Sequence, residues 1–369
     1  MFQIIYNDKN SCARTGTLKT AHGNIQTPIF LPVVTKGAGK YLTFRELEEL
    51  NTQMFISNAF LLSLKPGLSI LKQTKGYHNF INWKKPIITD SGGFQGGDPT
   101  LFVSLNEQGL KFRSPFNGDL CFYSPEDVVK INKIIGSDIM MVLDDMLTPN
   151  HTKKEFKKAV DITIDWAQRS LKAHNLKTQQ IFGIVQGGVY KDLRKECALS
   201  LNNMPFDGIG IGGLAIGEPK PKMYKAIDAS LPEIDKSKFK YLMGVGSPED
   251  ILECISRGID CFDSVYPTRM ARHGVVFTKN GPLKIYHKNH EYSFTPIDKN
   301  CDCYTCRNHT RAYLHHLYRI KEPNAMILLS IHNIRFMHKL TENARTSIKK
   351  NQFEKFKTIF LKDYLENSK

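Results

Sequence analysis

The chain has 369 residues, of which 41% are hydrophobic and 24% charged, a composition typical of a globular protein with a sizeable buried core. No apolar run approaches the ~20 residues that a membrane-spanning helix needs, and residues 1–8 lack the basic and apolar segments of a secretory signal, so we exclude membrane and secreted proteins and expect a cytoplasmic one. Lysine and arginine number 51 against 36 acidic residues, a net charge of +15 that suits a polyanionic partner, although a merely solvated basic surface would give the same total.

Short apolar, β-branched runs recur along the chain, and each ends in small or polar residues. Near-continuous apolar runs of this length are typical of strands buried on both faces, as in parallel sheets. In chain order they occupy residues 28–33, 54–58, 86–90, 138–144, 181–186, 208–213, 241–246 and 259–263. Helical patterns lie between them, the longest over residues 153–173, and several open with a capping-box sequence. The boxes pair Thr43 with Glu46, Ser124 with Asp127, and Ser247 with Asp250.

Eight such runs alternating with helical patterns predict an α/β fold, a (β/α)8 TIM barrel. A doubly wound open sheet is the main rival, but no G-x-G-x-x-G turn with a downstream ribose-binding acid supports it. The longest gap between runs holds two strand-like segments around Asn117-Gly118, a dipeptide typical of tight hairpin turns. We therefore expect an inserted β-hairpin between residues 90 and 138.

Polar side chains close several of the predicted strands, where the active sites of such barrels lie. Asp90 opens an Asp-Ser-Gly-Gly-Phe-Gln segment whose paired glycines would let the backbone pass close to a ligand. An ordinary turn between a strand and a helix would explain the same sequence. Asp263 is followed by Arg269 and Arg272. That grouping fits either a helix-capping ion pair or a carboxylate that attacks an anomeric carbon while the arginines hold phosphates.

Three of the eight cysteines, Cys301, Cys303 and Cys306, crowd together, whereas the other five are scattered as in a reducing compartment. Three thiolates and a fourth ligand predict one tetrahedral, structural Zn²⁺ ion; three incidental thiols are the alternative. His332 is our preferred fourth ligand, and its competitors are His309, His315, His316 and His338. We therefore expect a barrel over residues 1–290, a zinc-binding subdomain over 291–340 and a C-terminal helix over 341–369 that packs back on the barrel.

Together these segments resemble the tRNA-guanine transglycosylases, also called queuine tRNA-ribosyltransferases. The matching motifs run in family order from about residue 10 to about residue 340. They are Asp-Ser-Gly-Gly-Phe-Gln at 90–95, Val-Leu-Asp-Asp at 142–145, Val-Gln-Gly-Gly at 185–188, Gly-Gly-Leu-Ala-Ile-Gly-Glu at 212–218, Met-Gly-Val-Gly at 243–246, Phe-Asp at 262–263 with Pro-Thr-Arg at 267–269, and the Cys-x-Cys-x2-Cys…His site.

The resemblance implies a base exchange at guanine 34 of tRNAs with GUN anticodons, those for Asp, Asn, His and Tyr. A 7-deazaguanine replaces guanine, in queuosine modification, without a break in the phosphodiester chain. Asp263 would be the nucleophile and form a covalent ribosyl-aspartate, as in a retaining glycosidase. Asp90 would be the general acid/base for the leaving and entering bases.

The resemblance also implies how the base and the tRNA are held. The Asp144 carboxylate suits the N1–H and exocyclic amine of a guanine-like edge, and Gln186 can donate to its carbonyl oxygen. Arg269 and Arg272, with the basic zinc-binding subdomain, would bind the phosphates of the tRNA anticodon arm. The side chains of Ser91, Phe94 and Met243 would shape the pocket, although core packing explains the last two equally well. The expected base-binding residues are Ser91, Phe94, Asp144, Gln186, Gly213, Leu214 and Met243.

Family members pair as homodimers through the zinc region, where Tyr313 and His316 lie, although ordinary helix packing explains these two equally well. A non-catalytic RNA-binding accessory subunit is disfavoured because Asp90 and Asp263 are both present. A nucleoside or glycoside hydrolase is disfavoured because the zinc lobe and the charge do not suit a small free substrate.

Some positions depart from the usual bacterial pattern. Asp145 and Met146 stand where bacterial members commonly have Glu and Cys, and Phe94 stands where they have Tyr. Ile216, in contrast, is branched as in bacterial enzymes. Both 7-aminomethyl-7-deazaguanine and queuine are therefore candidates for the incoming base. The Gly-Gly-Asp-Pro segment at 96–99 also departs from the family and has no assigned role.

Overall fold

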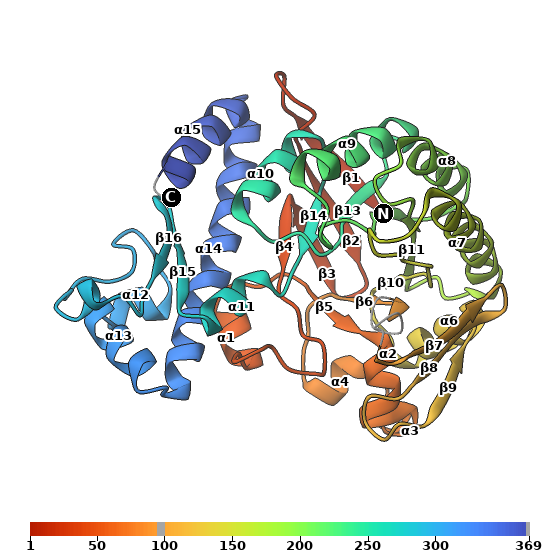
Figure 1. Ribbon diagram of the computed structural model, residues 1–369, viewed down its shortest axis with the longest axis horizontal. Coiled ribbons are helices and arrows are strands. Elements are labelled where there is room, and N and C mark those ends of the chain that lie inside the picture. The colour runs from red at the N-terminus through yellow and green to blue at the C-terminus, as the bar shows by residue number, and fades with distance from the viewer. Residues whose placement is uncertain (94–99, 367–369) are drawn as a thin grey trace.

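A computed structural model describes residues 1–93 and 100–366 of the chain, and its centre is an eight-stranded parallel sheet (Figure 1). The strands follow one another in the order β4-β14-β13-β12-β11-β10-β6-β5. The two outer strands meet as well, because Val33 forms a parallel bridge to Ile56 and the Val34 N–H donates to the Ile56 carbonyl over 2.8 Å. The sheet is thus closed into a barrel. Its strands are β4 (Ile29–Leu31), β5 (Phe55–Asn58), β6 (Ile87–Asp90), β10 (Ile139–Met141), β11 (Gln180–Val185), β12 (Gly208–Ile211), β13 (Phe239–Leu242) and β14 (Cys261–Asp263).

Each of the eight predicted apolar runs overlaps one barrel strand, so the (β/α)8 prediction is confirmed and the open-sheet rival is excluded. Most strands are shorter than their runs, and in five of the eight the last residues of the run already belong to the loop above the barrel. The run at 138–144, for example, gives a strand that ends at Met141. Most strand residues are buried whichever way they point, as expected for strands packed on both faces.

Helices surround the barrel, and their first turns are capped largely as the sequence predicts. Thr43 and Ser124 each form a complete capping box, whereas the Ser247 side chain accepts the backbone N–H of Asp250. The long amphipathic helix covers the predicted residues. The helices up to the end of the barrel are α1 (Phe44–Glu49), α2 (Ala59–Leu62), α3 (Leu68–Gln73), α4 (Tyr77–Ile81), α6 (Pro125–Ile135), α7 (Lys153–Ala173), α8 (Lys191–Asn202), α9 (Lys220–Ser230), α10 (Pro248–Ser256) and α11 (Tyr266–Arg272).

A small antiparallel sheet covers the end of the barrel where the strands begin. It consists of β1 (Phe2–Asn7), β2 (Arg14–Thr20) and β3 (Gly23–Thr27). Arg14 forms a buried ion pair of 2.6 Å with Asp260, which directly precedes β14. In the turn after β2, the His22 backbone and ring bond the Asp138 carboxylate, just before β10. The opposite end, where the strands finish, is left for a binding site.

The insertion between β6 and α6 is an antiparallel sheet. The hairpin expected there is confirmed by β8 (Gly109–Arg113) and β9 (Leu120–Tyr123), which pair across Asn117-Gly118. A third strand, β7 (Phe102–Asn106), pairs with β8 and was not predicted. Its sequence, Phe-Val-Ser-Leu-Asn, is neither a continuous apolar run nor a strict alternation of apolar and polar residues, and most of its residues are exposed.

The C-terminal part forms a lobe beside the barrel, and the long helix α14 stands between the two (Figure 1). Asn333, in the middle of α14, bonds the backbone of Pro267, Val275 and Phe277 and so ties the helix to α11 and β15. Within residues 1–93 and 100–366, every helix is too short or too polar to cross a lipid bilayer. The elements of this part are β15 (Val275–Thr278), β16 (Gly281–Lys284), α12 (Tyr304–Asn308), α13 (Arg311–Arg319), α14 (Pro323–Lys349) and α15 (Phe353–Glu366).

Candidate active site

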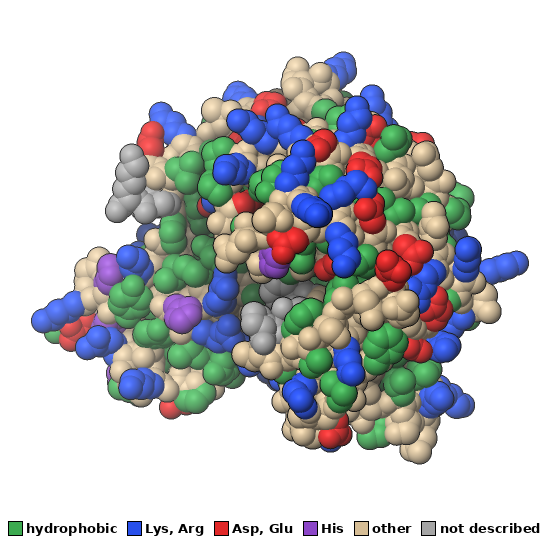
Figure 2. Space-filling view, turned by 45° about the vertical axis from the view of Figure 1, so that its right-hand side comes forward, with side chains coloured by type: hydrophobic (Ala, Val, Ile, Leu, Met, Phe, Trp, Pro, Cys, Tyr) green, Lys and Arg blue, Asp and Glu red, His purple; other side chains and the backbone are tan. Residues whose placement is uncertain are grey.

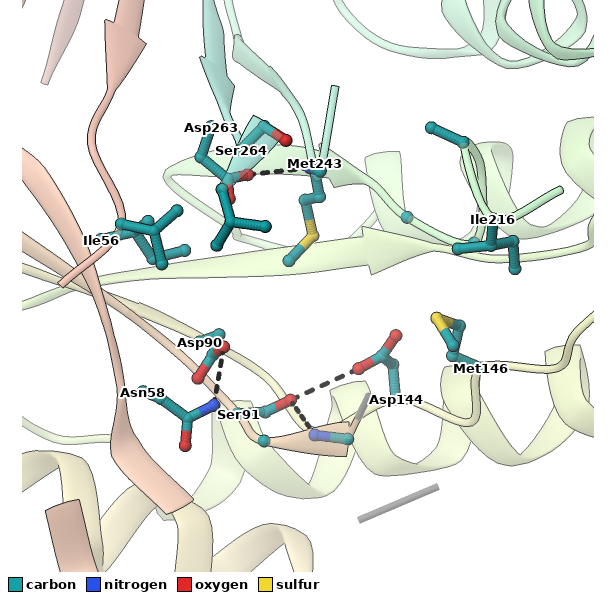
Figure 3. A pocket seen from close by; sticks show the side chains of 18 of the residues that line it. Ile56, Asn58, Asp90, Ser91, Asp144, Met146, Ile216, Met243, Asp263 and Ser264 are labelled. Atoms are coloured by element: carbon teal, nitrogen blue, oxygen red, sulfur yellow. Dashed lines mark hydrogen bonds between the residues drawn. The ribbon is translucent and has the colours of Figure 1, made fainter. Parts of the chain in front are cut away.

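A cavity of about 310 Å³ opens at the end of the barrel where the strands finish. This volume lies at the small end of the range for ligand pockets, and the cavity combines apolar walls with a few convergent polar groups. Figure 3 shows Asp90, Asp144 and Asp263 around it; Asp90 and Asp263 end β6 and β14, and Asp144 lies in the loop after β10. The residues that line it include Ile56, Asn58, Asp90, Ser91, Asp144, Met146, Gln186, Gly213, Leu214, Ile216, Met243, Asp263, Ser264 and Arg269.

Asp90, the last residue of β6, is held by its neighbour in the sheet. Asn58 is its register partner on β5, and the Asn58 amide donates to Asp90 Oδ2 over 2.9 Å. The amide is itself oriented, because Asn58 Oδ1 accepts the Leu61 N–H at the start of α2. Burial raises the pKa of Asp90 to about 7, and the nearby Asp263 charge acts in the same direction. Asp90 Oδ1 is buried without a partner in the part of the chain described, so it is free for a ligand.

Asp263, the last residue of β14, faces Asp90 across the cavity (Figure 3). Its Oδ1 accepts two hydrogen bonds, from the Tyr241 hydroxyl over 2.6 Å and from the Gly244 N–H over 2.9 Å. Burial raises the pKa of Asp263, and both of these bonds oppose that rise because they stabilise the charged form. The second carboxylate oxygen is not engaged by them. The two carboxylates therefore lie in different environments, which suits different chemical roles.

Asp144, Gln186 and Ser91 form a polar group on another side of the cavity. Gln186 Nε2 donates to Asp144 Oδ2 over 2.6 Å, and Ser91 Oγ donates to Asp144 Oδ1 over 3.4 Å. Burial raises the pKa of Asp144 to about 6, so the carboxylate is mainly charged at neutral pH. Gly93 lets the backbone pass close to Asp144, because a Cβ at this position would lie only 2.9 Å from Asp144 Oδ1.

The structure brings most of the sequence-predicted residues together at this cavity. Arg269 lies exposed at its rim, whereas Arg272, half-buried at the end of α11, is not part of the lining. Phe94 and the segment 96–99 lie outside the described residues. Sequence reasoning missed the part played by Tyr241. A tyrosine inside a buried strand needs a partner for its hydroxyl, and this was the available signal.

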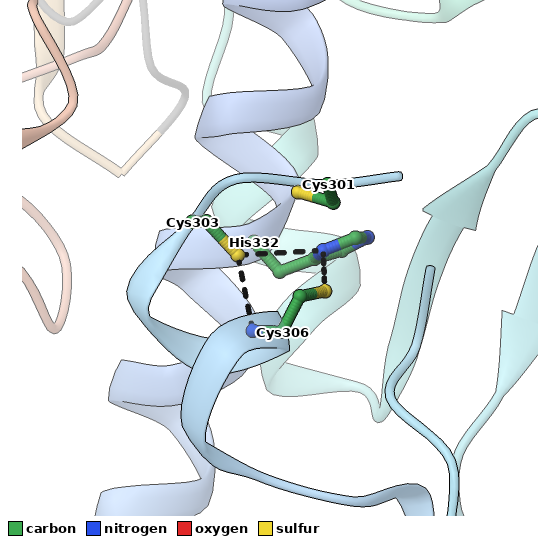
Figure 4. Close-up of side chains that lie close together, drawn as sticks. All are labelled: Cys301, Cys303, Cys306 and His332. Atoms are coloured by element: carbon green, nitrogen blue, oxygen red, sulfur yellow. Dashed lines mark hydrogen bonds between the residues drawn. The ribbon is translucent and has the colours of Figure 1, made fainter. Parts of the chain in front are cut away.

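The three clustered cysteines meet His332 of α14 in the C-terminal lobe (Figure 4). The four ligand atoms of Cys301, Cys303, Cys306 and His332 all lie within 4.8 Å of one another, and three of the residues are buried. His332 Nε2 bonds the Phe277 carbonyl over 2.7 Å, so Nδ1 is the ring atom turned to the thiols, 3.2 Å from Cys306 Sγ. A backbone partner on the far ring nitrogen is the usual arrangement of a metal-binding histidine. The group can therefore hold one metal ion.

Comparison with known proteins points to one family. The family model described as queuine tRNA-ribosyltransferase matches residues 8–366. The chain is 44% identical to a queuine tRNA-ribosyltransferase of Dictyoglomus turgidum, over all of this chain and 96% of that protein. It is 44% identical to the protein of that name from Thermoanaerobacter pseudethanolicus, over 98% and 97% of the two chains. With the Thermotoga maritima protein of the same name it shares 45% identity over 95% of each.

Proposed function

The chain belongs to the queuine tRNA-ribosyltransferase family, and we propose that it exchanges guanine 34 in tRNAs with GUN anticodons for a 7-deazaguanine. The reaction is a pentosyl transfer: the ribose of the tRNA changes its base while the phosphodiester chain stays intact. The observation that carries this proposal is the pair of opposed carboxylates, Asp90 and Asp263, at the strand ends of one cavity. Because these two carboxylates lie in different environments, one can act as the acid and the other as the nucleophile.

Asp263 is the nucleophile in this proposal. Its carboxylate attacks C1′ of the ribose, the bond from C1′ to the base nitrogen breaks, and the electron pair leaves with the base. Two hydrogen bonds to Oδ1 stabilise the charged form of Asp263, which is the form that attacks. The product is a ribosyl-aspartate ester.

Asp90 is the general acid and then the general base. With a pKa near 7, a substantial fraction of Asp90 is protonated at neutral pH, and this form gives its proton to the departing guanine. The same carboxylate then takes the proton of the incoming base, whose nitrogen attacks C1′ and displaces Asp263. Two inversions at C1′ restore the original configuration.

The remaining polar groups are assigned to recognition. The Asp144 carboxylate accepts the N1–H and exocyclic amine of the base. The Gln186 amide has two hydrogens, one bonded to Asp144 and one available for the base carbonyl oxygen. The remaining proposed base contacts come from Ser91, Phe94, Met243 and the backbone of Gly213 and Leu214.

The tRNA is held from outside the cavity in this proposal. Figure 2 shows many lysine and arginine side chains, with acidic ones among them, on the face in view, and some of the basic ones lie close to a central hollow. The anticodon arm would bind across this basic surface through its phosphates. Arg269 and Arg272 contribute to that binding, and guanine 34 turns out of the anticodon stack into the cavity.

The metal is proposed to be one structural Zn²⁺ per chain. Three thiolates and one imidazole are the ligand set that zinc prefers, and no position is left for a catalytic water. The ion would fix the C-terminal lobe. We also propose that two chains form a homodimer through this lobe, where Tyr313 and His316 are exposed on α13.

The test is the incorporation of labelled guanine into tRNA. Asp263→Asn should abolish exchange while tRNA binding persists, and Asp90→Ala should also stop it. Wild-type enzyme with a slow base analogue should give a denaturant-resistant enzyme–tRNA adduct that is absent in Asp263→Asn. An adduct on another residue would refute the nucleophile assignment, and release of guanine without incorporation would identify a hydrolase instead. Normal tRNA binding with no exchange by the wild type would identify an accessory subunit.

A further inference from the structure

Arg194, on the first turn of α8, is fully buried. No carboxylate lies within ion-pair distance of it in residues 1–93 and 100–366. Its guanidinium bonds only backbone carbonyls. Nε donates to Gly188 over 2.7 Å and Nη1 to Val185 over 2.9 Å, while Nη2 donates to Gly212 over 2.7 Å and to Gly213 over 3.4 Å. Burying a cation in this way is costly, so the position calls for an explanation.

The carbonyls that Arg194 holds belong to two neighbouring strand ends. Val185 ends β11 and Gly188 lies in the loop that follows, whereas Gly212 and Gly213 follow β12. The sheet itself joins the strands only up to the Gly212 N–H, which donates to the Val185 carbonyl over 3.0 Å. Beyond that point the guanidinium is the group that bridges the two loops. One loop carries Gln186 and the other carries Gly213 and Leu214.

The Gln186 amide is clamped against the second loop. A Cβ at Gly213 would lie 2.2 Å from Gln186 Oε1, and a Cβ at Gly212 would lie 2.9 Å from Gln186 Nε2. Gln186 is 2% exposed, and its Nε2 bonds Asp144. A shift of either loop therefore changes the orientation of the amide and of the carboxylate bonded to it. Close-packed surroundings of this kind transmit small displacements.

Arginine is the one side chain whose geometry suits this position. Its planar guanidinium offers five N–H donors in fixed directions, whereas lysine offers three from a single atom. Burial lowers the pKa of Arg194 to about 10, so the group is still protonated at neutral pH. Bonds from a charged donor are stronger than those between neutral groups. The planar, charged guanidinium of Arg194 therefore holds the loops after β11 and β12 in a fixed relative position.

We propose that Arg194 is a positioning residue for base recognition, which fixes the loops after β11 and β12 so that Gln186, Asp144 and the Gly213–Leu214 backbone meet the edge of the base. This rests on the proposed function, because it assigns those residues to the base. It implies that Arg194 sets the affinity for the free base and has little influence on the grip on tRNA. The tRNA phosphates bind outside the cavity, remote from this buried side chain.

The experiment compares Arg194→Lys and Arg194→Met with a matched control, Arg257→Lys, at a half-exposed arginine that pairs with Asp228 and Glu253. Labelled guanine incorporation gives KM for guanine, KM for tRNA and kcat separately. We expect both Arg194 variants to raise KM for guanine by about tenfold or more and to change KM for tRNA by less than about twofold. Arg257→Lys should leave both values near those of the wild type. Melting temperature and bound metal report whether each variant is folded.

A double-mutant cycle separates positioning from general damage. If Arg194 acts through Gln186, then Arg194→Lys should weaken guanine binding far less in a Gln186→Ala background than in the wild type. Additive effects, an unchanged KM for guanine, or equal losses for guanine and tRNA would overturn the proposal. If neither Arg194 variant folds, the residue supports the barrel as a whole and the proposal is also overturned. A wild-type enzyme that exchanges no guanine would instead refute the proposed function.

Discussion

Tyr241→Phe removes one hydrogen bond from Asp263, the proposed nucleophile. The Tyr241 hydroxyl is buried in the barrel and donates to Asp263 Oδ1 over 2.6 Å. Phenylalanine keeps the ring in place, and the Gly244 N–H still donates to the same oxygen. The perturbation is therefore confined to the charge stabilisation of a single carboxylate.

The size of the effect follows from the bond that is lost. A hydrogen bond to a charged group contributes about 1.5–3 kcal/mol, and one pKa unit corresponds to about 1.4 kcal/mol. The bond favours the ionised form of Asp263, so its loss raises the pKa of Asp263 by about one to two units. Attack on C1′ needs the ionised form. The acidic limb of the pH profile of kcat/KM should therefore move to higher pH by the same amount.

The alkaline limb should stay in place because it reports the proton on Asp90, whose pKa lies near 7. The bell-shaped profile thus narrows from its acidic side and its maximum falls. The measurement is the rate of labelled guanine incorporation into tRNA from mildly acidic to mildly alkaline pH. Tyr123→Phe is the matched control, since that tyrosine bonds Ser63 away from the cavity. An acidic limb that coincides with that of the wild type would refute the reasoning.

Three further substitutions test other parts of the site. Asn58→Ser keeps an N-cap acceptor for α2 but removes the amide donor to Asp90, so the pKa of Asp90 should rise. The alkaline limb of the pH profile of guanine exchange should then move to higher pH, and an alkaline limb at the wild-type pH would contradict this. Cys306→Ser should lower bound zinc, by elemental analysis, well below about one ion per chain and lower the melting temperature, whereas Cys121→Ser should preserve both. Ile216→Gly widens the end of the cavity and should raise the use of queuine over 7-aminomethyl-7-deazaguanine by about tenfold in direct competition; equal preference in both enzymes would show that Ile216 does not set the choice.

The barrel was predictable because its strands are buried on both faces and so carry continuous apolar runs. The same periodicity placed Asp90 and Asp263 at strand ends, and parallel strands bring such ends to one edge. Cysteine spacing likewise predicted the metal-binding group, and among the candidate histidines of the described residues it is His332 whose ring nitrogen lies within 4.8 Å of the three thiols. Strand β7 was missed because its five residues, Phe-Val-Ser-Leu-Asn, show neither a continuous apolar run nor a strict alternation.

Tyr241 and Arg194 show why the rest could not be read from the sequence. Each is a fully buried polar residue, and its role depends on the atoms that satisfy its hydrogen-bonding groups. Those atoms come from Asp263 in one case and from two strand-end loops in the other, and all of them lie on another element than the side chain that they satisfy. Burial without a partner would be costly for both side chains, so the fold must supply the partners. In this site the partners are the proposed catalytic and base-binding groups, and the polar residues hidden in the barrel wall are therefore the ones that set its chemistry.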